Sequence, residues 1–123
     1  MATLSKIFVR RRAVLISGGI SSFQNYPRYL NNLVGFYSCL VGARYGFDPA
    51  EIQVLYANNG VYDMAGNSVT TVVATETNVK DAIARAIQGD PSQGIPALAD
   101  DDLLVLLTTN HGDSSTVPHR LLL

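Results

Sequence analysis

A run of five branched apolar residues, Leu103–Leu107, most constrains the fold of this chain. The run has no polar alternation, which is typical of a strand that is buried on both faces of a parallel sheet. Polar residues follow it directly, in the order Thr108, Thr109, Asn110, His111, Gly112 and Asp113. In open α/β sheets, sites are built at the carboxyl ends of the strands. The sequence therefore predicts a reactive corner where this strand ends.

Two further strands and two helices are predicted upstream of this run. The strands are Ala13–Ser17 and Ile52–Tyr56, and a weaker strand or hairpin arm is predicted at Val69–Thr75. One helix runs from Arg28 and stops by Gly46, since its apolar residues recur at intervals of three and four. The second helix is expected to be capped by Asn78 and to end at Gly89.

The alternation of these elements defines the expected fold. The order is strand, helix, strand, weak strand, helix, strand, which predicts a mostly parallel sheet with right-handed crossovers. We therefore expect an α/β three-layer sandwich with three main strands and flanking helices. With 123 residues the chain is one domain, and this thin sheet resembles the first part of a larger one. The apolar edge of strand 103–107 is expected to associate with another chain, either identical or different.

Composition narrows the class of protein. Hydrophobic residues make up 47% and charged residues 15% of the chain, which is a globular composition. The net charge of −1 offers no field that would attract nucleic acid or an acidic membrane surface. No apolar segment approaches the roughly 20 residues that span a bilayer, and the first residues lack the pattern of a secretory signal. We therefore expect a cytoplasmic protein that binds neither nucleic acid nor membranes.

Several smaller features are expected to have structural rather than functional roles. The basic cluster Arg10–Arg12 is expected to be a solvated lead-in to the first strand. Gly35 and Gly42 are expected to allow close packing of the first helix against the sheet. Cys39, the single cysteine, is expected to be a buried packing residue of that helix, and it excludes a disulfide framework or a thiolate metal cluster.

The chemistry of the corner rests on His111. A neutral imidazole at a strand end can act as general base when a nucleophile and an orienting partner lie within hydrogen-bond reach. The next residue, Gly112, can offer a backbone N–H to a developing oxyanion. A lone histidine is nevertheless more often a capped loop residue than a catalytic one.

Two other site types have weaker support in the sequence. The segment Ser17–Ser22 follows a strand as phosphate loops do, but it lacks both common nucleotide-binding glycine patterns. Asp100–Asp102 precede the last strand, at the end opposite His111, and are expected to form a solvated acidic loop. His119 is too isolated to be a zinc ligand. We therefore expect neither a metal nor a cofactor.

The chain resembles the caspase-like cysteine peptidases, and most closely their legumain branch, which includes the transamidase that attaches glycolipid anchors. The resemblance covers most of the chain: the strand AVLIS, the loop SFQNY, a long helix, the segment FDPAEIQVLYANN, the helix near IARAIQGD and the strand that ends in TTNHGD. It implies a caspase-like sandwich, of which the first three main strands are present, and the cleavage of peptide or protein substrates.

The resemblance also assigns roles to residues. It implies that His111 is the catalytic histidine, that Gly112 donates an oxyanion N–H, and that Asn25 orients the histidine. Arg28 corresponds to an arginine of the specificity pocket, which implies an acidic or amide side chain in the substrate. In the family this arginine directly follows a tyrosine, whereas in this chain Pro27 lies between Tyr26 and Arg28. The corner reads Asn-His-Gly, where Asp-His-Gly is commoner.

The nucleophile is the main departure from the family pattern. In that family the cysteine ends a fourth strand, well downstream of the histidine, whereas Cys39 lies upstream of it. Two functions therefore compete. The chain is either a cysteine endopeptidase domain whose nucleophile comes from another segment, or a non-catalytic interaction module of the same fold that binds through the 103–107 edge.

Overall fold

A four-stranded parallel sheet organises the residues that this computed structural model describes, which are 10–18, 27–57 and 61–110. The order across the sheet is β3-β2-β1-β4. The elements are β1 (Arg11–Gly18), α2 (Pro27–Val41), β2 (Ile52–Tyr56), β3 (Val72–Val73), α3 (Glu76–Gln88) and β4 (Leu103–Asn110), with single 3-10 turns at Pro49–Glu51 and Pro91–Gln93. The predicted α/β fold with a parallel sheet is confirmed.

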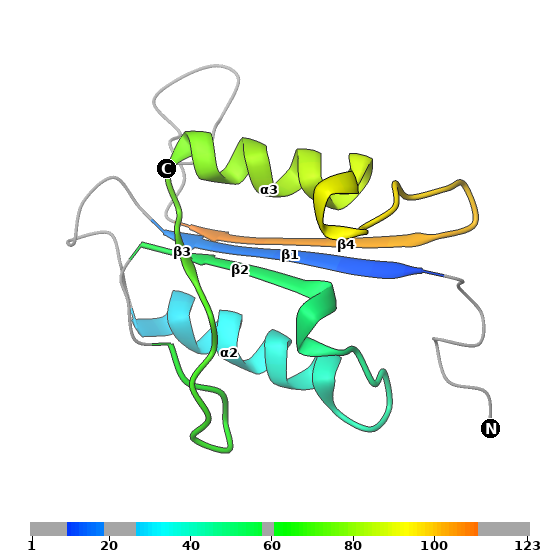
Figure 1. The fold of residues 1–123 in the computed structure, drawn as a ribbon. Helices are drawn as coiled ribbons and strands as arrows, with labels where there is room; N and C mark the ends of the chain where they lie inside the picture. The colour runs from blue at the N-terminus through cyan, green and yellow to red at the C-terminus, as the bar shows by residue number, and fades with distance from the viewer. Residues whose placement is uncertain (1–9, 19–26, 58–60, 111–123) are drawn as a thin grey trace.

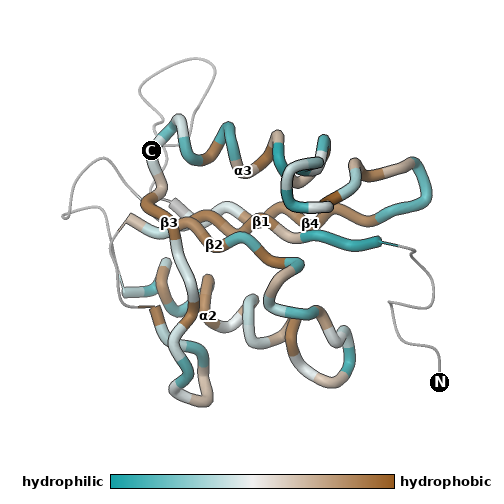
Figure 2. Tube along the Cα trace, in the orientation of Figure 1, coloured by the Kyte–Doolittle hydropathy of each residue, from teal (hydrophilic) through white to brown (hydrophobic). Residues whose placement is uncertain are grey.

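The two helices cover opposite faces of the sheet, so the molecule has three layers (Figure 1). Successive side chains of a strand point to opposite faces. Ala13 and Leu15 of β1 accordingly pack in the hydrophobic cluster beneath α2, whereas Val14 and Ile16 pack in the cluster beneath α3. Figure 2 shows the hydrophobic residues concentrated in the strands between the helices.

The most buried strand is β1 and not β4. Residues 13–16 of β1 are at most 2% exposed, because β2 and β4 flank this strand and a helix covers each face. The expectation that Leu103–Leu107 is buried on both faces is wrong. These residues are half-buried for the most part, and Leu106 is 52% exposed, because β4 lies at the edge of the described sheet. An unbroken apolar run indicates hydrophobic surroundings but not a central place in the sheet.

The first helix differs from its prediction in three details. It ends at Val41, and Gly46, with a φ of 61°, instead closes the following turn through an N–H···O bond of 2.7 Å to Gly42. Close packing of Gly35 and Gly42 against the sheet is not observed, since a Cβ at Gly35 would meet nothing within 4 Å and one at Gly42 would meet only carbonyls of its own helix. Cys39 is exposed, because it lies on the flank of α2 that the sheet does not cover.

Capping groups set the other boundaries. Asp48 caps the 3-10 turn before β2 in a full capping box with Glu51. The cap of α3 is Thr75 and not Asn78: the Thr75 hydroxyl accepts the Asn78 N–H at 3.1 Å. Gly89 ends α3 as expected, with a φ of 73°. The weak strand at Val69–Thr75 is reduced to Val72–Val73.

Arg11 and Arg12, the first two residues of β1, are not a solvated lead-in. Both helices run antiparallel to the strands, so their carboxyl ends lie at the amino edge of the sheet, where β1 begins (Figure 1). Carbonyl groups at helix ends carry partial negative charge and attract cations. The guanidinium of Arg11 donates to the carbonyls of Tyr45 at 2.6 Å and Gly46 at 2.5 Å. The guanidinium of Arg12 donates to the carbonyl of Ala86 at 2.7 Å, in the last turn of α3, and to that of Pro96.

Arg11 is the most deeply placed of the three arginines, with only 7% of the residue exposed. Its guanidinium also lies 4.5 Å from the centre of the Phe47 ring and 3.4 Å from the Glu51 carboxylate. These contacts compensate the loss of water around a buried charge. Arg11 thereby joins β1 to the turn that leaves α2.

Arg10 joins β1 to the start of β4. Its backbone N–H donates to Asp102 at 2.9 Å, and its side chain lies 3.6 Å from the same carboxylate. The backbone N–H of Ala99 and these Arg10 contacts hold the pKa of Asp102 below its usual range. Asp102 is therefore a structural residue, while Asp100 and Asp101 are exposed.

No helix among the described residues is long and apolar enough to cross a membrane.

Replacing Arg11 with Met should lower the free energy of unfolding by about 2–4 kcal/mol, because two carbonyls and Glu51 lose a buried partner. Urea unfolding followed by circular dichroism measures the loss. Arg10→Met is the matched control, and it should cost less than about 1 kcal/mol because that side chain is 43% exposed. Equal losses in the two variants would show that Arg11 does not have this role.

Candidate active site

The connectivity of the sheet singles out the carboxyl ends of β1 and β4. From β1 the chain proceeds to β2 and β3 on one side, and it then returns to place β4 on the other side of β1. In open α/β sheets, ligands bind in the crevice at such a switch point. Gly18 and Asn110 are the last paired residues of β1 and β4. The segments that contain Asn25 and His111 therefore leave the sheet from adjacent strand ends.

Three of the four predicted site residues, His111, Gly112 and Asn25, lie outside the described residues. The fourth, Arg28, is exposed in the first turn of α2, the helix end nearest the carboxyl edge of β1 (Figure 1). Its guanidinium donates to the Tyr29 hydroxyl at 3.2 Å and lies 5.1 Å from the centre of that ring. The structure thus brings Arg28 to the edge of the sheet where the switch point lies.

A row of hydroxyl groups crosses the sheet just before these strand ends. Ser17 of β1 is paired with Tyr56 of β2 on one side and with Thr109 of β4 on the other. Residues paired in a parallel sheet project from the same face, and Tyr56 belongs to the cluster beneath α2. The three side chains therefore project from the α2 face of the sheet.

Ser17 is the member of this row that sequence analysis missed as a site residue. It is 1% exposed, and its hydroxyl has no hydrogen-bond partner among the described residues. Buried polar atoms without a partner are rare in proteins. The signal in the sequence was slight: Ser17 is the one polar residue of AVLIS, and it stands at the end of the run.

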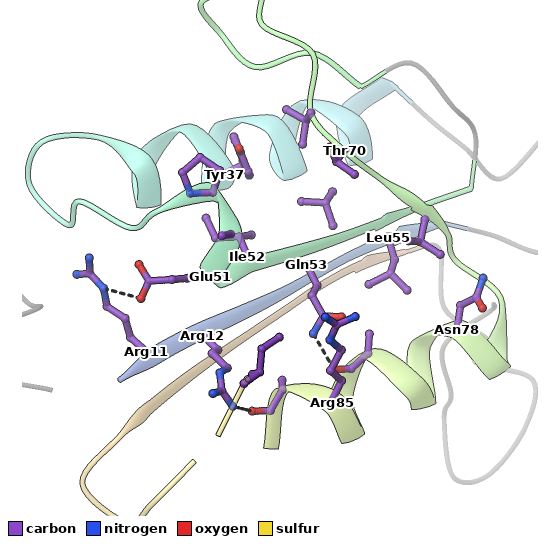
Figure 3. Close-up of a pocket in the computed structure, with 18 of the residues that line it drawn as sticks. Arg11, Arg12, Tyr37, Glu51, Ile52, Gln53, Leu55, Thr70, Asn78 and Arg85 are labelled. Atoms are coloured by element: carbon purple, nitrogen blue, oxygen red, sulfur yellow. Dashed lines mark hydrogen bonds and ion pairs between the residues drawn. The ribbon is translucent and has the colours of Figure 1, made fainter. Parts of the chain in front are cut away.

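Another hollow of the described structure lies away from these strand ends. It has a volume of about 1070 Å³ and follows the outer edge of β2, between the 67–70 segment and α3 (Figure 3). Three of its polar side chains have partners: Gln53 donates to the Ala82 carbonyl at 2.9 Å, and Arg11 and Arg12 bind the groups described above. Burial, assisted by the carboxylates of Asp63 and Asp48, raises the pKa of the Tyr37 phenol there, so this group stays protonated. We assign no chemistry to this groove.

A second hollow of about 530 Å³ lies between α2 and β4. The residues that line it are Asn31, Asn32, Gly35, Phe36, Cys39 and Leu107–Thr109. It follows the open edge of β4 and contains no charged side chain.

Metal and nucleotide sites gain no support. The described residues contain no group of three or more His, Cys, Asp or Glu side chains that could hold a metal ion. The Ser17–Ser22 segment and His119 lie largely or wholly outside those residues.

A comparison of the sequence with protein-family models and with curated proteins finds no match.

Substitution of Ser17 by alanine should leave the free energy of unfolding unchanged or raise it by up to about 1 kcal/mol, because an unpaired buried hydroxyl is costly. Leu15→Ala, two residues earlier on the same face and fully buried, should cost about 2–5 kcal/mol and serves as the comparison. Both values come from urea unfolding. A loss above about 1 kcal/mol for Ser17→Ala would mean that this hydroxyl binds a structural partner.

Proposed function

We propose that this chain is the histidine-bearing part of a cysteine endopeptidase of the caspase-like, legumain type. The observation that carries the proposal is the pairing of Gly18 with Asn110 at the switch point of the sheet. His111 follows Asn110 directly, and the segment with Asn25 begins directly after Gly18. The two residues that the family resemblance pairs in catalysis thus belong to segments that leave neighbouring strand ends.

The roles follow from the chemistry of acyl transfer. His111 accepts the proton of a cysteine thiol, and the thiolate attacks the scissile carbonyl carbon. The Gly112 N–H stabilises the oxyanion that forms. The imidazolium then gives its proton to the leaving amine as the C–N bond breaks, and water hydrolyses the acyl-enzyme. The Asn25 side chain holds the other ring nitrogen of His111 and so fixes its orientation.

Arg28 is the specificity residue of this proposal. Its place in the first turn of α2, at the carboxyl edge, supports a contact with bound substrate. A guanidinium binds carboxylate or amide oxygens well. The substrate class is therefore a peptide with an acidic or amide side chain before the scissile bond.

Cys39 is not the proposed nucleophile. It lies near the far end of the 15-residue helix that begins beside the candidate site. With a rise of 1.5 Å per residue, the helix carries it roughly 16 Å from Arg28, towards the amino edge. The nucleophile of this proposal belongs to a strand from another segment.

Adding such a strand, an apolar segment that ends in a cysteine, in trans should produce thiol-dependent cleavage of fluorogenic peptides that have Asn or Asp before the scissile bond. His111→Ala should lower kcat/KM by at least about 100-fold, because the base is lost. Cys39→Ser should leave the rate unchanged. Undiminished cleavage by His111→Ala would remove this residue from the mechanism.

The contact between Asn25 and His111 can be tested without a nucleophile. In ¹⁵N NMR spectra, Asn25→Ala should change the tautomer ratio and the pKa of the His111 imidazole, since an orienting hydrogen bond is lost. His119, the other histidine of the chain, is the internal control and should not respond. Identical His111 spectra in the two proteins would contradict the assigned role of Asn25.

A second candidate function is binding through the edge of β4 without catalysis. Its support is the open edge itself, where Leu106 exposes 52% of its surface and β1 is the only strand paired with β4 among the described residues. The two functions respond to different substitutions. Leu106→Lys should abolish binding through the edge and His111→Ala should not affect it, whereas catalysis depends on His111.

A further inference from the structure

We propose that the edge of β4 pairs with β4 of a second copy of this chain, antiparallel and about a two-fold axis at Leu106, to form one continuous eight-stranded sheet. The inference rests on the binding role proposed for this edge and not on the peptidase proposal.

The edge of β4 lacks the features that keep sheet edges apart. Soluble proteins protect edge strands with charged residues, prolines, bulges or very short strands. The eight residues Leu103–Asn110 include neither a charged residue nor a proline. They pair with β1 over their whole length, so the strand is regular and its second edge is free for pairing within the described structure.

The flank of α2 extends the same surface. The hollow between α2 and β4 places Phe36 and Gly35 beside Leu107. Phe36 is 36% exposed, and a Cβ at Gly35 would meet nothing within 4 Å. A strand added to β4 would thus find room for its side chains above the glycine and an aromatic ring to pack against.

The position of the axis follows from the faces of the strand. A two-fold axis perpendicular to a sheet keeps each face on its own side, so only residues of the same parity can lie opposite each other. An axis at Leu106 places this exposed leucine opposite its own copy, on the α3 side. On the α2 side it places Val105 opposite Leu107. The most exposed apolar side chain of the strand is then at the centre of the interface.

The charged residues near β4 favour antiparallel pairing. They also favour a partner with the same arrangement of charges, which a second copy of the chain has. Asp100 and Asp101 are exposed just before the amino end of β4. Arg28 is exposed in α2, one turn before the residues of this helix that flank the carboxyl half of β4. An antiparallel copy keeps the two acidic ends apart, at opposite ends of the interface. A parallel copy would place acidic end beside acidic end, which is repulsive.

The opposite edge of the sheet is a natural comparison. Val72 of β3 is also 52% exposed, so a substitution there changes the surface to a similar degree. However, β3 has only two residues, which is too short an edge for stable pairing with another strand.

Sedimentation equilibrium should show a monomer–dimer equilibrium for the wild-type chain. Leu106→Lys should raise the dissociation constant at least about tenfold, because like charges would lie opposite each other. Val72→Lys should change it less than about twofold. A wild-type chain that stays monomeric, or equal effects of the two lysines, would overturn the proposal, while the peptidase proposal is tested separately, by the response of cleavage to His111→Ala.

Disulfide cross-linking tests the register with substitutions that keep the strand apolar. In a Cys39→Ser background, Leu106→Cys should form a covalent dimer on mild oxidation, because Cβ atoms directly opposite each other lie about 4.5–5.5 Å apart and a small shift brings them within disulfide reach. Leu104→Cys and Thr108→Cys should cross-link efficiently only with each other. A dimer that does not cross-link at position 106 would overturn this register.

Discussion

The attachment of β1 to both helices through Arg11 and Arg12 is the interaction on which this structure depends. The guanidinium of Arg11 binds carbonyl groups of the turn that follows α2, that of Arg12 binds a carbonyl in the last turn of α3, and the two helices lie on opposite faces of the sheet. Adjacent residues of a strand point to opposite faces, so two consecutive arginines can bind both layers. Because these carbonyl groups carry negative charge, the cations satisfy them at the point where the chain leaves each helix.

The same antiparallel course of helices and strands determines where a site can form. Since the helices return the chain to the amino edge, the loops that follow the strands are left at the carboxyl edge. The strand order reverses between β1 and β4, and α2 and α3 lie on opposite faces of the sheet there. Tyr56, Ser17 and Thr109 lie side by side there, on the α2 face, and the proposed catalytic segments begin just beyond them.

Local sequence patterns predicted most of the strands and helices. They did not predict features that depend on contacts between residues far apart in the sequence. Ile52–Tyr56 is a strand as predicted, because a short apolar run follows a complete capping box. The cap of α3 was misplaced because Thr75 and Asn78 are both good capping residues, and only the backbone conformation distinguishes them. The burial of Arg11 could not be foreseen, since its carbonyl partners lie more than 30 residues away in the sequence. The corner at His111 lies outside the described residues and stays a prediction, while the assignment of Ser17 required the sheet register.

Arg10–Arg12 lie at the amino edge of the sheet and the candidate site lies at the carboxyl edge. This separation affects which substitutions the protein can accept. Substitutions among Arg10–Arg12 and their carbonyl partners should change how strongly the helices are held to the sheet, at the edge opposite the candidate site. The stability of the fold and the candidate site therefore depend on residues at opposite edges of one small sheet. Substitutions that shift the melting temperature through the arginines can leave the residues of the candidate site unchanged.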